Sequence, residues 1–252
     1  MIQGSMFELT GKTVLVTGAA KRLGNAIAFG LAKQGMNVIV HYDKSESEAR
    51  KLRDEIVELG VKSWLVSADF SNSDSCKELV EQANELSGRI DVLVNNASVF
   101  SAGDMNHVRF EDIEVKMLTN TWTPFLLSRY FSEKTICGKI INILDTRIVG
   151  YDYDHFAYYL SKRMLEVLTK SMALKLAPDI TVNGVAPGLI LPPEGKDEGY
   201  LEQRKNSVPL RKYGSPSDVV ETVLFLLRND FVTGQIIYVD GGKHLVQTVE
   251  GL

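Results

Sequence analysis

Short runs of apolar and β-branched residues alternate with longer amphipathic segments along nearly the whole chain. The short runs lie at 13–17, 37–41, 63–66, 91–94, 139–144, 181–185 and 236–239, and their near-continuous apolar character is typical of strands buried on both faces. Helical periodicity fills the intervals at 23–34, 47–59, 75–86, 111–134, 155–177 and 217–227. This alternation predicts a doubly wound α/β fold, in which a parallel sheet carries helices on both faces.

A single domain, 1–252, accounts for the whole length. The 252 residues include 44% hydrophobic residues, which is enough for a large core, and no linker or repeat divides the chain. Residues 1–8 precede the first strand and are set apart as an N-terminal extension. The segment 188–206 is rich in Pro and Gly and follows a strand. Because ligands bind beyond the strand ends of open α/β sheets, we expect a substrate loop or lid there.

Charge and cysteine content exclude several classes of protein. The formal net charge is −4 and no basic tail is present, which argues against a surface for nucleic acid or anionic membrane. Two cysteines, Cys76 and Cys137, cannot form a disulfide framework, and no secretory signal or membrane-spanning run is visible, so a cytoplasmic location is expected. The four histidines lack the spacing of metal ligands, and no metal is expected.

The stretch 17–24, Thr-Gly-Ala-Ala-Lys-Arg-Leu-Gly, follows the first strand and opens a helix. This setting is typical of a dinucleotide-binding turn, whose helix N-terminus offers free N–H groups and a positive dipole end to a pyrophosphate. Lys21 and Arg22 place two positive charges at the positive end of the helix dipole, which is unfavourable unless an anion binds there. We therefore infer that this turn contacts phosphate. The candidate cofactor-binding residues here are Thr17, Gly18, Lys21, Arg22, Leu23 and Gly24.

The end of the second strand bears on which nicotinamide cofactor binds. It reads His41, Tyr42, Asp43, Lys44, Ser45. A carboxylate at this point holds the ribose hydroxyls of NAD, whereas a 2′-phosphate calls for cations and hydroxyls. Tyr42 occupies the carboxylate position with Lys44 and Ser45 beyond it, which favours NADPH over NADH, although Asp43 lies close by. The simpler interpretation of Lys44 is a solvated lysine.

Tyr158 and Lys162 stand four residues apart in a helical segment, so their side chains project from one face. A nearby ammonium stabilises a phenolate, and we expect Lys162 to lower the pKa of Tyr158 and make it an acid catalyst. An exposed i,i+4 pair is the alternative on spacing alone. The strands and the nucleotide turn elsewhere in the chain favour the catalytic interpretation.

Taken together, these residues resemble the short-chain dehydrogenase/reductase family from about residue 9 to residue 244. The motifs that carry the resemblance are the turn 17–24, Ala68 and Asp69, Asn95 with Asn96 and Ala97, Tyr158 with Lys162, Pro187 and Gly188, and Asp240 with Gly241 and Gly242. The resemblance implies a Rossmann-type sheet of seven strands. It also implies a homotetramer that associates through the long helices 111–134 and 155–177 and the C-terminal segment.

The same resemblance implies roles for individual residues. Asp69 would lie near the adenine, Asn95 would support the adenine pocket, and Pro187 and Gly188 would lie beside the nicotinamide. Phe70 and Ala97, next to these motifs, belong to the candidate cofactor-binding set. Lys162 would hold the nicotinamide ribose, Tyr158 would be the catalytic acid, and Asn120 would anchor a proton-relay water. His41 and Tyr42 complete the candidate cofactor-binding set.

Within the family, the chain is similar to pteridine reductases and to bacterial dihydromonapterin reductases. The similarity rests on Arg22 in the turn, on Ser98 and Phe100 after the fourth strand, and on Asp145, where ordinary carbonyl reductases carry a serine. It implies that Arg22 reaches both cofactor phosphate and substrate, and that Phe100 stacks on a pterin. The substrate-binding set is then Arg22, Ser98, Phe100, Asp145 and Tyr158.

The aspartate changes the chemistry to be expected. A serine donates a hydrogen bond to a ketone oxygen, whereas an ionised carboxylate only accepts and repels charge developing there. Asp145 therefore suits a heterocycle with N–H groups or a ring nitrogen that receives a proton. Capping of a neighbouring loop is the simpler role for Asp145, and burial in the core is the simpler role for Phe100.

The sequence therefore predicts an NADPH-dependent reductase that transfers hydride to a dihydropterin. Reduction of a ketone or a 3-oxoacyl thioester is the nearer alternative, with Asp145 as the feature against it. A non-catalytic NADPH-binding sensor is the alternative from another class, and the complete pair Tyr158 and Lys162 weighs against it.

Overall fold

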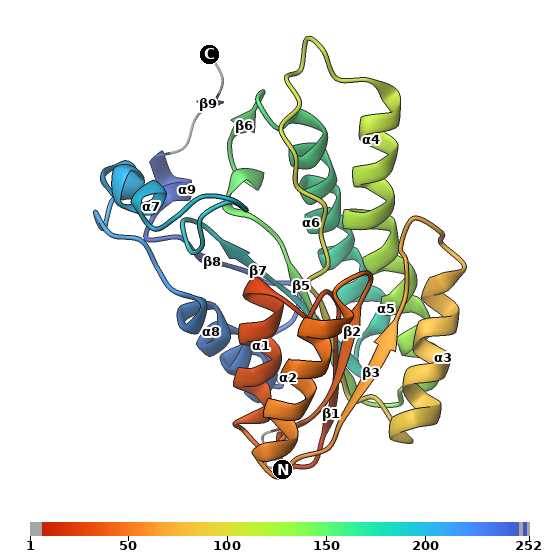
Figure 1. Ribbon diagram of the computed structural model, residues 1–252. Helices are drawn as coiled ribbons and strands as arrows, with labels where there is room; N and C mark the ends of the chain where they lie inside the picture. The colour runs from red at the N-terminus through yellow and green to blue at the C-terminus, as the bar shows by residue number, and fades with distance from the viewer. Residues whose placement is uncertain (1–6, 247–248, 251–252) are drawn as a thin grey trace.

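The strands of the computed structural model, which describes residues 7–246 and 249–250, form a parallel sheet that runs through the molecule (Figure 1). The strands are β1 Thr13–Val16, β2 Asn37–Tyr42, β3 Ser63–Ser67, β4 Val92–Asn95, β5 Gly138–Ile143, β7 Ile180–Pro187 and β8 Ile236–Val239. They are ordered β3-β2-β1-β4-β5-β7-β8, and every neighbouring pair is parallel. The predicted doubly wound fold and its seven-stranded sheet are confirmed.

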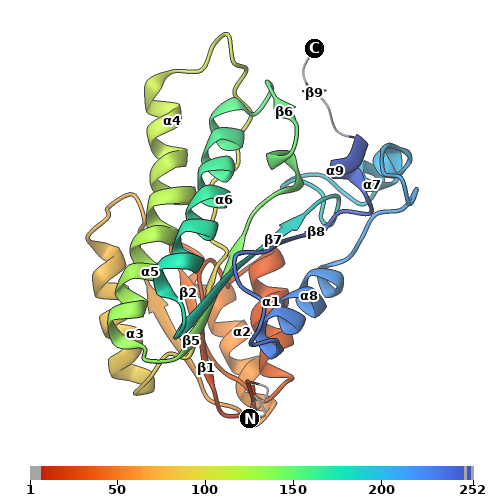
Figure 2. The same cartoon turned by 180° about the vertical axis from the view of Figure 1, so that it is seen from behind.

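Helices cover the sheet in two layers (Figure 1 and Figure 2). One layer contains α1 Arg22–Ala32, α2 Glu46–Glu58 and α8 Pro216–Arg228, and the other contains α3 Ser75–Ser87, α4 Phe110–Met117, α5 Thr123–Lys134 and α6 Phe156–Leu176. Alternate strand residues face opposite layers. In β1, for example, Val14 and Val16 pack toward α1 and α8, whereas Leu15 packs toward α3 and α5.

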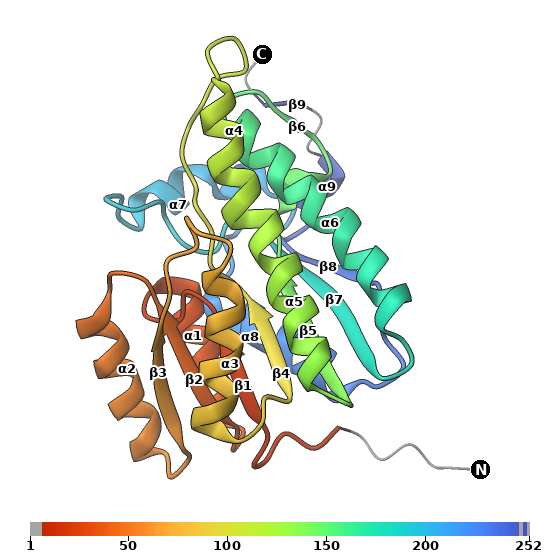
Figure 3. The ribbon, with the colours of Figure 1, turned by 90° about the vertical axis from the view of Figure 1, so that its right-hand side faces the viewer.

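The long helix predicted over 111–134 is interrupted. A π-helical turn, Leu118–Trp122, joins α4 to α5, and the three pieces follow one another beside α6 (Figure 3). Such turns insert one residue into an α-helix and often occur at functional sites. The inserted turn contains Asn120, which is fully buried.

Short elements lie beyond the edge toward which the strands run (Figure 1). They are the 3₁₀ turn Thr146–Ile148, β6 Tyr151–Asp152 paired with β9 Val249–Glu250, α7 Gly199–Arg204 with the 3₁₀ turn Lys205–Ser207, and α9 Lys243–Val246. The segment predicted as an irregular loop, 188–206, thus contains a short helix. Of the expected N-terminal extension 1–8, residues 1–6 lie outside the described residues.

Within the described ranges, no helix has both the length and the apolar character that a bilayer span needs.

Candidate active site

Two glycines shape the turn after β1. Gly18 has a φ of +60°, which disfavours any other residue, and a Cβ on Gly24 would lie 2.2 Å from the carbonyl oxygen of Gly18. The side chain of Asn96 closes the turn by donating to the carbonyl oxygens of Thr17, at 2.9 Å, and Gly18, at 3.2 Å. The turn is therefore fixed before any ligand arrives.

Arg22 begins α1 in an uncommon backbone conformation. Its φ is +54°, in the left-handed region that costs a residue with a side chain about 1–2 kcal/mol. Its guanidinium donates a 2.5 Å hydrogen bond to the carbonyl oxygen of Pro192, within the segment 188–206. The preceding Lys21 pairs with Glu48 at 2.8 Å. Arg22 thus ties the nucleotide turn to the expected substrate loop.

His41 supports the turn from beneath. Its Nδ1 accepts a 2.9 Å hydrogen bond from the Gly18 N–H, so its Nε2 carries the hydrogen and donates to the carbonyl oxygen of Ala68 at 3.1 Å. Burial lowers the pKa of His41 to about 4, which keeps the ring neutral. Phe70 stacks on the ring at 4.5 Å between centroids. Both ring nitrogens of His41 contact backbone, so its geometry is that of a support for the cofactor cavity.

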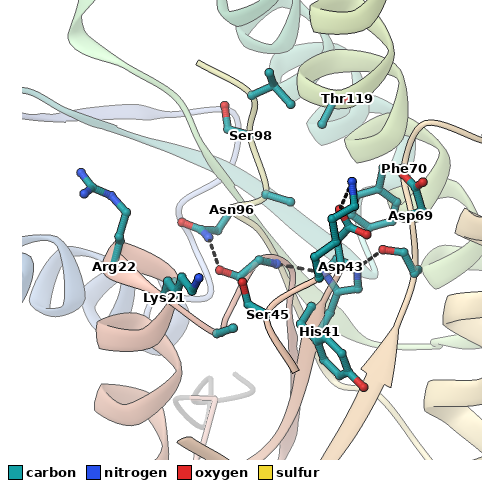
Figure 4. A pocket seen from close by; sticks show the side chains of 18 of the residues that line it. Lys21, Arg22, His41, Asp43, Ser45, Asp69, Phe70, Asn96, Ser98 and Thr119 are labelled. Atoms are coloured by element: carbon teal, nitrogen blue, oxygen red, sulfur yellow. Dashed lines mark hydrogen bonds and ion pairs between the residues drawn. The ribbon is translucent and has the colours of Figure 1, made fainter. Parts of the chain in front are cut away.

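A cavity of about 550 Å³ opens above this turn (Figure 4). Most of the predicted cofactor-binding residues line it, namely Gly18, Lys21, Arg22, Leu23, Gly24, His41, Tyr42, Lys44, Ser45, Asp69, Phe70 and Ala97, together with Ser98 of the predicted substrate set. Figure 4 shows Arg22 at one end and Asp69 with Phe70 at the other. The cavity is thus long enough to connect the end of β1 with the end of β3.

Five of the predicted cofactor residues lie outside the lining of this cavity, namely Thr17, Asn95, Lys162, Pro187 and Gly188. Lys162 and Gly188 are described with the second cavity below, and the other three lie at the ends of strands. Thr17 is buried, and its hydroxyl oxygen accepts from the N–H groups of Asn96, at 2.9 Å, and Ala97, at 3.0 Å. Asn95 is buried and donates to Asn142 Oδ1 at 2.8 Å. Pro187 ends β7. Their geometry is that of positioning residues for the strand ends.

The cavity fits a dinucleotide with phosphates at the α1 N-terminus. The first turn of α1 has no acidic residue, and Lys21 and Arg22 stand at its start. The N–H groups of the first helical turn and these cations would hold a pyrophosphate. At the end of β2, Lys44 is largely exposed and lies 3.9 Å from Asp43. A cation and a carboxylate are thus both present where the adenine ribose would lie.

A second cavity, of about 840 Å³, lies beside the first, and Arg22 lines both. Phe100, Asp145, Tyr158 and Gly188 line it, together with residues absent from the predicted site, including Arg147, His155, Tyr200, Arg204 and Lys243. The strand ends of β5 and β7 and the segment 188–206 therefore share one cavity.

Tyr158 and Asp145 are directly hydrogen-bonded in this second cavity. The Tyr158 hydroxyl donates to Asp145 Oδ2 at 2.9 Å, while Asp145 Oδ1 accepts from the N–H of Arg147 at 2.9 Å. Asp145 therefore caps the 3₁₀ turn and also faces the tyrosine. Burial raises the pKa of Asp145 despite the opposing charges of Arg147 and Lys162. A carboxyl group of this kind can carry a proton at higher pH than an exposed one.

The expected lowering of the Tyr158 pKa by Lys162 is not observed. Burial, and then the charge of Asp145, raise the pKa of Tyr158 well above its ordinary value. Lys162 Nζ lies 5.8 Å from the centroid of the tyrosine ring and donates to the carbonyl oxygen of Ile143 at 2.8 Å. Burial lowers the pKa of Lys162 to about 8. The carboxylate contacts the phenol oxygen directly and so outweighs the more distant ammonium.

Asn120 connects three segments around the site. Its Oδ1 accepts from the Val99 N–H at 2.8 Å and the Ser98 hydroxyl at 3.1 Å, and its Nδ2 donates to Ser161 Oγ at 3.0 Å. The π-turn thus holds the segment after β4 against the helix that carries Tyr158. The water-anchoring role implied for Asn120 stays a prediction.

Phe100 lies on the wall of the second cavity with 46% of its surface exposed. Its ring stacks on His155 at 4.8 Å and an interplanar angle of 18°, and it meets Tyr158 edge to face at 4.8 Å. Phe100 is therefore not a core residue, which was the simpler role considered for it. Its ring is held at the cavity by His155 and Tyr158. Its geometry is that of a flat platform next to the Tyr158 hydroxyl.

Sequence reasoning missed a group of polar residues behind that platform. Asp152, fully buried, contacts both Arg147 and His155. The spacing of Asp152 and His155 by three residues was a local signal for a pair, but nothing in the sequence indicated that Arg147 joins them. No three His, Cys, Asp or Glu side chains converge as metal ligands would among the residues described.

Comparisons with known proteins agree with this arrangement. A family model described as enoyl-(acyl carrier protein) reductase matches residues 18–244. FolM alternative dihydrofolate reductase 1 from Brucella canis, solved with NADP, is 32% identical with a TM-score of 0.91, over 96% of this chain and 97% of that one. Its counterpart from Brucella suis, also with NADP, is 32% identical with a TM-score of 0.89, over 95% and 97%. The 3-oxoacyl-(acyl-carrier-protein) reductase FabG of Staphylococcus epidermidis is 32% identical over 244 residues, 93% of this chain and 99% of the relative.

Proposed function

The chain belongs to the short-chain dehydrogenase/reductase family of oxidoreductases, and on that basis we propose that it is an NADPH-dependent reductase of a dihydropterin. The reaction reduces a C=N bond, with hydride added to the carbon and a proton to the nitrogen. One observation carries the proposal. A protonatable carboxyl group, Asp145, is hydrogen-bonded to the Tyr158 hydroxyl beside the exposed ring of Phe100.

The cavity suits a flat nitrogen heterocycle. Phe100 offers an aromatic face, and Asp145 offers carboxyl oxygens that accept from ring N–H groups. Arg22 reaches the same cavity from the nucleotide turn. A ring held between Phe100 and the cofactor would place its imine carbon within reach of the hydride, as positioning catalysis requires. The likeness to alternative dihydrofolate reductases, whose substrate carries a pterin ring, supports this choice.

The pKa shifts indicate a route for the proton. Because the Tyr158 phenolate is disfavoured next to Asp145, Tyr158 releases its proton readily only when another proton replaces it. Protonated Asp145 can supply that proton when the direction of the 2.9 Å hydrogen bond reverses, so that the Tyr158 O–H points to the substrate nitrogen and the Asp145 O–H points to the Tyr158 oxygen. As the Tyr158 proton goes to the substrate nitrogen, the Asp145 proton goes to the Tyr158 oxygen. Asp145 is left ionised and regains a proton from solvent through the open cavity.

NADPH is the cofactor we propose, and it supplies the hydride when bound. The NADP seen with the Brucella proteins supports the choice, as does Tyr42 in place of a carboxylate with Lys44 and Ser45 next to it. Lys162, held by the Ile143 carbonyl, would contact the nicotinamide ribose. Asp69 and Phe70 would lie at the adenine end.

The test is NADPH oxidation with dihydrobiopterin, dihydromonapterin and dihydrofolate in parallel assays, each repeated with NADH. We expect turnover of at least one dihydropterin and a preference for NADPH. Tight NADPH binding without turnover of any pterin or carbonyl compound would contradict the proposal and favour a sensor.

Reduction of a 3-oxoacyl thioester is the second candidate, because the FabG relatives match nearly the whole chain at the same identity as the FolM proteins. The carboxyl group of Asp145 disfavours it, since an ionised acid repels the charge that develops on a ketone oxygen. Acetoacetyl thioesters should therefore be reduced much more slowly than dihydropterins. The opposite ranking would make this candidate the function.

We also propose a homotetramer formed through the α4–α6 face. Apolar side chains are exposed along these helices, namely Phe110, Val115, Trp122, Met164, Val167 and Leu174. Apolar surface of this kind is typical of sites of protein association. Light scattering during size-exclusion chromatography should give four times the mass of one chain.

A cytoplasmic location stays part of the proposal. It is supported by two free cysteine thiols, the buried Cys76 and the exposed Cys137, which suit a reducing compartment.

A further inference from the structure

Asp240 lies behind the second cavity, just after β8, and is almost completely buried. Only 6% of its surface is exposed, and it is absent from the cavity lining. It begins the motif 240–242, which the proposed reaction does not use. Its Oδ1 accepts from the Gly242 N–H at 2.9 Å, and its Oδ2 accepts from the His244 N–H at 2.7 Å and the Thr146 hydroxyl at 2.5 Å. Asp240 therefore joins its own loop to a segment that is distant in the sequence.

The contact between Asp240 and Thr146 involves a charged acceptor. Burial alone would raise the pKa of Asp240, but the hydrogen bonds from the Thr146 hydroxyl and the His244 N–H outweigh burial and lower the pKa below its ordinary value. Asp240 is therefore ionised at neutral pH and can only accept, so the Thr146 hydroxyl donates. A hydrogen bond to an ionised acceptor is stronger than one between neutral groups. Thr146, with 5% of its surface exposed, is thus firmly anchored.

This anchor adjoins the proposed proton donor. Thr146 follows Asp145 directly and opens the 3₁₀ turn Thr146–Ile148, in which the Arg147 N–H donates to Asp145 Oδ1 at 2.9 Å. The orientation of the Asp145 carboxyl group therefore depends on where this turn lies. The Arg147 side chain also holds the turn, through its contact with Asp152, but the Thr146 contact is the one next to Asp145.

Asp240 packs against a second part of the cavity wall. A Cβ on Gly188 would lie 2.6 Å from Asp240 Cβ and 2.9 Å from its Cα, which leaves room only for glycine. Gly188 follows β7, which separates β5 from β8 in the sheet. The hydrogen bond to Thr146 therefore reaches across the end of β7, from the segment after β8 to the segment after β5. One buried carboxylate thus fixes two residues of the wall, Thr146 and Gly188.

We propose that Asp240 is a positioning residue, which holds the turn after Asp145 through the Thr146 hydroxyl and so fixes the Asp145 carboxyl group against Tyr158. The inference rests on the proposed proton route, in which the hydrogen bond between these two groups must form and reverse. A shift of about 1 Å in a reacting group can lower a rate by about 100-fold. Because Arg147 still holds the turn, loss of the Thr146 contact should cost less, about 10-fold or somewhat more.

The test compares Thr146→Val, which keeps the shape of the side chain but removes the hydroxyl, with Thr146→Ser, which keeps the hydroxyl. Thr146→Val should lower kcat for a dihydropterin by about 10-fold or more, with NADPH affinity nearly unchanged. Thr146→Ser should restore most of the rate. Thr135→Val is the matched control, because the buried Thr135 hydroxyl also donates to a distant segment, at the Ile90 carbonyl oxygen, but lies outside both cavities. Its turnover should equal that of the wild type.

Asp240→Asn tests the other side of the contact. It removes the charge of the acceptor and should slow turnover in the same way. Because both changes act on one bond, Thr146→Val should add little further loss to Asp240→Asn. Wild-type kcat in Thr146→Val, or a Thr146→Ser as slow as Thr146→Val, would overturn the proposal. Should Asp240→Asn fail to fold, the Thr146 variants decide alone.

Hydrogen exchange separates this proposal from the pterin assignment, because it needs no substrate. The Arg147 N–H, which is held by Asp145, should exchange faster in Thr146→Val than in the wild type, and at the wild-type rate in Thr146→Ser. Equal exchange in the wild type and Thr146→Val would contradict the proposal even in inactive protein. Failure of the pterin assignment would instead appear as wild-type protein that reduces no dihydropterin, while the exchange rates still differ as expected.

Discussion

The Tyr158 hydroxyl donates its hydrogen bond to Asp145, at 2.9 Å, rather than to a neutral partner. While it is ionised, Asp145 makes the phenol harder to ionise, and once it is protonated it can offer Tyr158 a replacement proton. The pair therefore functions as a unit, and single changes on either side should affect turnover far more than cofactor affinity.

Asp145→Ser removes the proton source while leaving a hydrogen-bonding group. We expect kcat/KM for the dihydropterin to fall by about 100-fold or more, the usual range for loss of an acid catalyst, with NADPH affinity nearly unchanged. Stopped-flow rates and fluorescence titration would measure the two. Asp145→Asn, which still accepts from Tyr158 but carries no proton, should be equally slow. Normal turnover in either variant would remove Asp145 from the mechanism.

Tyr158→Phe removes only the oxygen that links Asp145 to the substrate. Turnover should again fall by about 100-fold or more, while NADPH still binds, because the ring and the Lys162 contact stay in place. Tyr159→Phe is the matched control, since Tyr159 is also buried but its ring lies against Tyr151. If Tyr158→Phe keeps the wild-type rate, the proton comes from another group.

His41 makes stability depend on pH. Burial lowers its pKa to about 4 from an ordinary value of 6.5, so between these values the unfolded chain binds a proton that the folded one does not. The free energy of unfolding should therefore drop as pH falls, by about 3 kcal/mol from this group. Urea unfolding at neutral and acid pH would show a smaller drop for His41→Asn. His107→Gln, at an exposed position, should behave as wild type, and equal drops in all three proteins would contradict the assignment.

Arg22 should carry a measurable backbone cost. Arg22→Gly and Arg22→Ala both lose the guanidinium, but only glycine adopts a φ of +54° without strain. We expect Arg22→Gly to be more stable than Arg22→Ala by about 1 kcal/mol, and both to bind NADPH and pterin more weakly than wild type. Urea midpoints and binding titrations provide the comparison. Equal stabilities would mean that the turn relaxes when the side chain is shortened.

The elements and the location of the site followed from the sequence because each rests on local pattern. The apolar runs gave the strands, and the polar residues just after them, such as Asn95 and Asp145, had to meet at one edge of a parallel sheet. The four-residue spacing of Tyr158 and Lys162 placed them on one helical face. All of these depend on neighbours within a few residues.

The remaining features depend on contacts between distant segments. Residues 118–122 contain no Gly or Pro to mark a π-turn, which is fixed by the bonds of Asn120 to Val99 and Ser161. The expected lowering of the Tyr158 pKa was wrong because the spacing to Lys162 says nothing about which charge contacts the phenol oxygen. Asp152 was not singled out from the sequence, because its burial depends on how the segment 145–156 folds.

The contact between Arg22 and the Pro192 carbonyl joins the two cavities proposed for cofactor and substrate, because Arg22 lines both of them. A phosphate or pterin that draws the guanidinium to itself must compete with that contact, and so changes how firmly the residues near Pro192 are held. If one ligand changes the affinity for the other through this contact, the second ligand changes the affinity for the first by the same factor. Substitutions near Pro192 should therefore change the dissociation constant of the cofactor even though these residues do not contact it.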